Sequence, residues 1–404
     1  MFGLVAHVHQ SELRALAVAF ACHFVLLASY YILRPVRDTM ATVFGVAQLQ
    51  YLFTVTFLVT LACAPIYSAL ASRLALTRFL PGIFWFWLLN ILLFYVLFKM
   101  GPHNRLVAAA YFTWFSVANL FIVSLFWSLM ADLFSAEQAT RLFGVVAAGG
   151  SLGAILGPVI TRLLAPVVGV SGLLLIAAGG FALVIVLIHE LMRQKARLRL
   201  LNDEGQKSSL DQPLPGNPFE GFIKLLRSPY LRHQAAYMLL MTWIATVAYF
   251  LQTDLIAKSF ADIAHRTQAI ADIDLVVNCC SALVASLGLG RMLQRFGVTT
   301  GLLFNPLIMV VAFLGVLVWP SLRMVQALQV VRRFSQYAVA RPSREICFTV
   351  VEQQSRYKAK SVIDTVVYRF GDVSAAWVQA LLRAAGFGLA GAVTLGLAAS
   401  AAWG

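Results

Sequence analysis

The side chains that could do chemistry gather in one stretch, residues 341–372, RPSREICFTVVEQQSRYKAKSVIDTVVYRFGD. Its arginines and lysines can hold an anion, and its aspartates can pair with them or carry a proton. Lys360, Asp364, Tyr368 and Asp372 fall four residues apart, so on a helix they form one slowly drifting stripe. Ionisable side chains inside apolar helices are costly and tend to line pathways or bind ligands. The stripe therefore predicts an aqueous cavity that receives a charged solute.

The candidate substrate-binding residues include one aspartate, and the rest are basic. They are Arg34, Arg37, Arg341, Arg344, Lys358, Lys360, Asp364 and Arg369. Guanidinium groups match phosphate and carboxylate geometry with two parallel hydrogen bonds. The excess of basic groups thus predicts an anionic substrate that carries more than one negative charge. The alternative is that the charges at 344, 345, 360 and 364 only form structural ion pairs between helices.

Composition predicts the elements that position these residues. The chain of 404 residues is 60% hydrophobic and 12% charged, with a mean hydropathy of +0.82, whereas soluble domains carry about 25% charged residues. Apolar blocks of about 20 residues recur, which is the length that crosses a bilayer. We expect an all-α polytopic membrane protein with about twelve transmembrane helices. Their approximate limits are 13–34, 48–71, 79–99, 107–131, 141–164, 170–191, 231–257, 267–293, 299–319, 323–350, 360–384 and 386–402.

The long polar stretch at 192–230 is rich in charge and proline, and it is predicted to be a cytoplasmic connector between two halves, 1–191 and 231–404. Of the 31 Lys and Arg residues, 16 fall in loops after even-numbered spans and 9 in loops after odd-numbered spans. By the positive-inside rule, the even-numbered loops and both termini are expected in the cytoplasm.

The two halves resemble each other. YYILRPVRDTM at 30–40 aligns with AYFLQTDLIAK at 248–258 at an offset of 218, and EQATR at 137–141 aligns with EQQSR at 352–356 at 215. Parallel repeats related by an axis along the membrane normal are the plan of major facilitator transporters, whose substrates bind between the halves. The sequence therefore predicts two pseudo-symmetric halves of six helices each.

Three local patterns give structural expectations. Pro35 removes a backbone donor, so the first helix should break or kink just before it, at 33–34. Glycines four residues apart in GGSLGAILG, 149–157, predict a face for close helix packing. Asp254 and Lys258 lie four apart on the seventh span and are expected to pair.

Several function classes find no support in the residues. The five cysteines sit in apolar stretches, and no Cys or His spacing matches a metal site. No nucleophile–base set and no phosphate-cradling loop is present. We therefore expect no catalytic residues, no metal, no cofactor and no nucleic-acid partner.

A resemblance to a known family adds to these expectations. SRYKAKSVIDTVVYRFGDVSAAW at 355–377 resembles the motif of the bacterial and plastid ATP/ADP antiporter (nucleotide transporter) family. The matching residues are Lys358, Lys360, Asp364, Arg369, Gly371 and Trp377. ILRPVRDTM resembles that family's Lys-Asp pair after the first span, with Arg37 in place of the lysine and Asp38 kept. AYFLQ at 248–252 departs from it, because classical members carry a glutamate there.

Together these patterns predict a secondary active transporter that moves an anionic, phosphorylated solute, such as ATP or ADP, by alternating access. Arg37, Lys358, Lys360 and Arg369 would hold the anion, and Asp364 would orient Lys360 or carry a coupling proton. The alternatives are a proton-coupled efflux carrier of other organic anions and a membrane partner protein that does not transport. We expect a monomer in the bilayer of a bacterial inner membrane.

Overall fold

A computed structural model describes residues 10–73, 76–101, 103–201, 220–287, 289–348, 351, 359–360 and 362–404. Over these residues the secondary structure is helical and without strands, so the prediction of an all-α protein is confirmed. The chain divides into two compact units. Unit 1 comprises 1–43, 58–214 and 262–275, and unit 2 comprises 44–57, 215–261 and 276–404.

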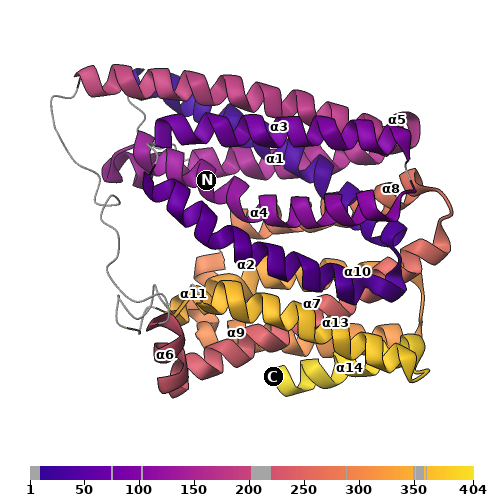
Figure 1. The fold of residues 1–404 in the computed structure, drawn as a ribbon. Helices are drawn as coiled ribbons and strands as arrows, with labels where there is room; N and C mark the ends of the chain where they lie inside the picture. The colour runs from indigo at the N-terminus through magenta and orange to yellow at the C-terminus, as the bar shows by residue number, and fades with distance from the viewer. Residues whose placement is uncertain are drawn as a thin grey trace. The chain divides into compact units, whose positions relative to one another are not determined.

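Unit 1 is built on long apolar helices. They are α1 (Gln10–Phe44), most of α2 (Leu49–Arg73), α3 (Leu76–Met100), α4 (Arg105–Leu133), α5 (Ala136–Leu201) and the first half of α8 (Ile263–Leu287). Helix α3 packs along α5 (Figure 1). Their shared core is rich in aromatic side chains such as Phe84 and Phe181, both at most 1% exposed. Helix α5 contains a break at Gly169, where φ is +67°, so its two arms correspond to the predicted spans 141–164 and 170–191.

The glycine face of α5 packs against α1. A Cβ atom added at Gly149, Gly153 or Gly157 would lie 2.6, 2.1 or 2.5 Å from a backbone oxygen of α1. Those oxygens belong to residues 20, 24 and 28, so both helices repeat the contact every four residues. Only a residue without a side chain permits this approach, and the predicted role of these glycines in packing is confirmed.

Helix α1 continues through Pro35 to Phe44, so a break at 33–34 is ruled out, and the kink that was the other expectation stays a prediction. Proline removes the donor that would bond the carbonyl of Tyr31, four residues back, and side chains bond two other backbone oxygens nearby. Tyr111 donates to the carbonyl of Leu33 at 3.2 Å, and Thr39 donates to the carbonyl of Pro35 at 2.9 Å. Membrane helices tolerate proline inside a span, and α1 is such a case.

Unit 2 is organised around α7 (Pro229–Ser259). It also contains η1 (Val46–Gln48), α6 (Glu220–Arg227), α9 (Leu289–Val318), α10 (Leu322–Ser335), η3 (Gln336–Ala340), α11 (Arg341–Cys347), η5 (Ile363–Val367), α13 (Tyr368–Ala384) and α14 (Gly388–Trp403). Helices α13 and α14 both pack on α7 (Figure 1). Helix α9 is interrupted at Gly297, where φ is +79°.

Eight helices within the described part of the chain are long and apolar enough to cross a membrane, and α14 is a shorter apolar helix. The segments from α10 to α13 do not meet these criteria, because they are short and carry the charges that the sequence singled out. Unit 2 thus places a strongly polar region among apolar helices.

Candidate functional site

The candidate site residues of unit 2 lie on α11, at Lys360, on η5 and on α13. Two π-helical turns, η3 and η5, precede α11 and α13 directly. A π turn bonds each amide to the carbonyl five residues back, which widens the helix, and such turns are frequent at functional sites. Sequence periodicity of 3.6 residues cannot locate them.

The charges around α11 form two ion pairs. Arg344 is 6% exposed, and its Nη1 lies 2.6 Å from Asp364 Oδ1. Lys360 donates to Glu345, and Arg344 Nη2 lies 4.0 Å from the same glutamate. Lys360 and Asp364 therefore take different partners, which corrects the expectation that Asp364 orients Lys360. Arg344 and Glu345 are neighbours on α11, so Lys360 and Asp364 both lie against that helix but bond different side chains.

A third pair lies on α13. Arg369 Nη1 is 3.3 Å from Asp372 Oδ2, and Thr246 of α7 donates to Asp372 Oδ1 at 3.0 Å. Asp372 is 7% exposed. Gly371 brings α13 close to α7, because an added Cβ would lie 2.9 Å from Thr242. Close helix packing thus holds this carboxylate where both of its oxygens are bonded.

The pairing leaves one candidate arginine of unit 2 distinct from the others. Arg344, Lys360 and Arg369 each contact an acid, whereas the described residues supply no carboxylate to Arg341, which is exposed at the start of α11. Lys358 lies outside the described residues. The ion pairs within 344–364 fit the structural alternative raised by the sequence, and Arg341 is the cation that this alternative does not explain.

The other two candidate arginines belong to unit 1, where each has a partner. Arg34 Nη1 lies 3.7 Å from Asp274 Oδ1, and Arg37 Nη2 lies 2.5 Å from Asp38 Oδ1. The Asp274 side chain has no exposed surface. The Arg37 guanidinium also lies 5.3 Å from the centre of the Phe112 ring, a distance that allows a cation–π contact.

Sequence reasoning missed the acids of α8. Asp274 pairs with Arg34, and Asp272 lies 3.2 Å from Arg162 Nε. The signal was present in IADIDLVV at 270–277, where two acids interrupt an apolar span. Their arginine partners lie more than 100 positions away in the sequence, so no local spacing links them.

Comparison with known proteins settles the family. A family model described as "Major Facilitator Superfamily" matches residues 19–339. The chain belongs to the Major Facilitator Superfamily. No curated protein matches it.

Solved structures of superfamily-type transporters share this fold. A bacterial homologue of the iron transporter ferroportin in an inward-facing state aligns with a TM-score of 0.70 at 11% identity, covering 98% of each chain. A bacterial homologue of the human lysosomal transporter Spinster aligns at 0.61 and 14%, covering 94% of this chain and 84% of the other. A POT family transporter in complex with 5-aminolevulinic acid aligns at 0.64 and 13%, covering 96% and 94%. At these identities the likeness concerns the fold alone.

Family and fold together identify an integral membrane transporter, not an enzyme. A Major Facilitator Superfamily chain of this kind works by alternating access on a small solute, in contact with membrane lipid. The superfamily includes carriers of many kinds of solute, whereas the ATP/ADP antiporter resemblance concerns one family with one class of substrate.

Proposed function

We propose that this superfamily member is a secondary transporter of an anionic, phosphorylated solute, with a nucleotide such as ATP or ADP as the leading candidate. The observation that carries the proposal is Arg341. It is exposed at the start of α11, has no carboxylate partner among the described residues, and lies three positions before Arg344 on the same helix. Residues three apart are neighbours on a helix surface, so the two guanidinium groups can approach one anion together.

The ion pairs give this site a way to respond to substrate. A phosphate offers the same acceptor geometry to a guanidinium as a carboxylate does. An arriving phosphate would compete with Asp364 for Arg344 and with Glu345 for Lys360. In this mechanism the pairs stabilise the empty site, and substrate binding exchanges an internal carboxylate for a phosphate oxygen.

The proposed carrier is a monomer of the bacterial inner membrane with both termini in the cytoplasm. The excess of Lys and Arg in the even-numbered loops supports cytoplasmic termini by the positive-inside rule. A bacterial inner membrane and a monomeric carrier fit the antiporter resemblance. Lys358, Arg369 and Arg37 remain candidate substrate ligands on the strength of the matching motifs.

A second candidate is a membrane partner protein that does not transport. The observation in its favour is that Arg344, Lys360 and Arg369 each already contact an acid. In that case the charges would serve only to hold α11 and α13 against their neighbours, and anions would have no effect on the protein.

Uptake into proteoliposomes tests these functions. We expect labelled ATP or ADP to enter vesicles loaded with unlabelled nucleotide, and a pH gradient to have little effect. Arg341→Gln should lower uptake by roughly tenfold or more, since a hydrogen bond to a charged group contributes about 1.5–3 kcal/mol. Arg323→Gln, an exposed arginine at the start of α10, is the matched control and should transport normally.

The other outcomes distinguish the alternatives. Uptake that needs a pH gradient and collapses with an uncoupler would favour a proton-coupled carrier of organic anions. No uptake or binding across a panel of nucleotides and sugar phosphates would refute the proposed substrate class and favour the partner protein.

A further inference from the structure

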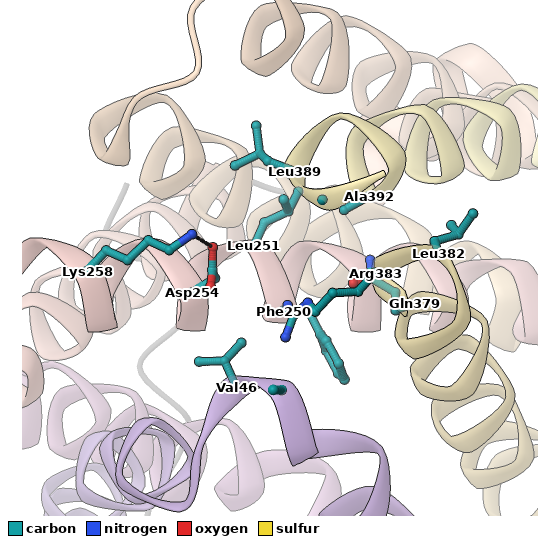
Figure 2. A pocket seen from close by; sticks show the side chains of 12 residues that line it. Val46, Phe250, Leu251, Asp254, Lys258, Gln379, Leu382, Arg383, Leu389 and Ala392 are labelled. Carbon is teal, nitrogen blue, oxygen red and sulfur yellow. Dashed lines mark hydrogen bonds and ion pairs between the residues drawn. The ribbon is translucent and has the colours of Figure 1, made fainter. Parts of the chain in front are cut away.

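Unit 2 contains a cavity of about 330 Å³, at the lower end of the range for small-molecule pockets. It lies where the end of α7, the end of α13, the start of α14 and η1 come together (Figure 2). All of its lining residues belong to unit 2. They are Val46, Ala47, Phe250, Leu251, Asp254, Lys258, Gln379, Leu382, Arg383, Gly388, Leu389 and Ala392.

One wall carries two groups that donate hydrogen bonds, Gln379 and Arg383. Gln379 is 6% exposed, and its side-chain Nε2 finds no hydrogen-bond partner among the described residues. A buried amide left in this state is destabilising unless something accepts a hydrogen bond from it. Arg383, one turn further along α13, has no ion-pair partner in the described part of the chain. A ligand with a hydrogen-bond acceptor could bond both side chains.

The opposite side of the cavity carries an acid, Asp254, which already forms an ion pair with Lys258. Lys258 Nζ lies 2.6 Å from Asp254 Oδ2, as the four-residue spacing predicts, and Figure 2 shows this pair across the cavity from Arg383 and Gln379. With Asp254 neutralised by Lys258, the guanidinium of Arg383 gives the cavity a net charge of +1. The ligand that balances it carries one negative charge.

The apolar lining of the cavity indicates what the uncharged part of the ligand is like. Phe250, Leu251, Leu382 and Leu389 give the cavity an apolar wall. A ligand that covers apolar surface gains binding free energy, because that surface is removed from water. A compact apolar group with a single anionic head therefore matches the lining better than a sugar or a polyanion.

We propose that this cavity is a binding site for a small amphiphilic monoanion. The anionic head accepts hydrogen bonds from Arg383 and from Gln379 Nε2, and the apolar body lies against Phe250 and Leu389. The site is separate from the charges proposed to hold the transported solute, because Gln379 lies seven residues beyond Asp372, about 10 Å along α13. Such a ligand would bind beside α7 and α13, two helices that are also joined by the hydrogen bond from Thr246 to Asp372.

Benzoate is a suitable probe, with neutral benzamide as its isosteric partner. Binding is measured by isothermal titration on the full-length protein in nanodiscs of phosphatidylcholine. We expect benzoate to bind and benzamide to bind at least tenfold more weakly. Arg383→Gln should weaken benzoate binding by roughly tenfold to a hundredfold, and Gln379→Met by roughly threefold to tenfold. Arg323→Gln makes the same chemical change at an exposed position and should leave binding unchanged.

The anionic head could belong to a free acid or to a lipid, and a second arm separates the two sources. Phosphatidylglycerol in the nanodisc competes with benzoate only if the lipid headgroup occupies the cavity. Benzoate binding that is unaffected by phosphatidylglycerol identifies a free acid. Equal binding of benzoate and benzamide, or benzoate binding that survives Arg383→Gln unchanged, would overturn the site. ATP titrated in parallel reports on the proposed substrate site, so the two proposals fail independently.

Discussion

The substitution Asp364→Asn tests the pair on which the candidate site depends. It removes the carboxylate that lies 2.6 Å from Arg344, whose side chain is only 8% exposed. Removing one partner of a fully buried pair costs about 3–5 kcal/mol. Two features lower this cost: the Asp364 side chain is 31% exposed, and Glu345 lies 4.0 Å from Arg344. We therefore expect a loss of roughly 2 kcal/mol in the free energy of unfolding.

Thermal unfolding of detergent-purified protein measures this loss, which should lower the midpoint by a few degrees. The double variant Arg344→Met/Asp364→Asn should recover most of it, because no charge is then left without a partner. Lys360→Met/Asp364→Asn removes one member of each pair and leaves Arg344 beside Glu345, so it should fold normally but no longer bind the anion. Asp262→Asn is the control: the position is exposed, and the asparagine amide oxygen can still accept the hydrogen bond from the His265 amide, so the unfolding midpoint should change little.

Two results would refute this reasoning. Unfolding of Asp364→Asn at the wild-type temperature would mean that Arg344 does not depend on this carboxylate. A stable Lys360→Met/Asp364→Asn variant that transports at the wild-type rate would show that the charges are only structural, and the site assignment would have to be withdrawn.

Three further substitutions test separate contacts by the same unfolding measurement. Gly153→Ala should cost about 1–3 kcal/mol, because its Cβ would lie 2.1 Å from a backbone oxygen of α1. Gly144→Ala, which meets nothing within 4 Å, should be neutral or stabilising by up to about 1 kcal/mol. Equal effects of the two would contradict the packing of α5 on α1. Arg34→Gln should cost about 2–4 kcal/mol, because it takes a cation from the fully buried Asp274 side chain. Arg341→Gln should stay within about 0.5 kcal/mol of wild type, and a larger loss would reveal a structural role.

The sequence predicted those parts of the fold that depend on local composition. Apolar blocks of bilayer length indicated the long helices, and the gap between spans 141–164 and 170–191 coincides with the break at Gly169. The glycine face of α5 and the pair of Asp254 with Lys258 were also predicted from spacing alone. In each case the determining groups lie within a few positions of one another.

Other features could not be predicted, because they depend on contacts between distant segments. Helix α1 runs through Pro35 to Phe44 without a break, which the local effect of a proline did not predict. The stripe from Lys360 to Asp372 assumed a regular α-helix, and η5 changes that geometry. Asp274 became recognisable as a partner of Arg34 only when α8 was placed against α1.

Stability and substrate binding make opposite demands on Asp364, and this opposition allows one more prediction. If a phosphate competes with Asp364 for Arg344, then Asp364→Asn removes the competitor while leaving both Arg344 and Lys360 in place. The variant should be less stable without ligand, yet ATP or pyrophosphate should raise its unfolding temperature more than that of the wild type, because the anion supplies the missing partner. Ligand stabilisation grows with the ratio of concentration to Kd, so titrations of both proteins give the change in affinity, which we expect to be roughly tenfold. Asp262→Asn again serves as the control. A purely structural pair predicts the reverse: a destabilised variant on which neither anion has a larger effect than on the wild type.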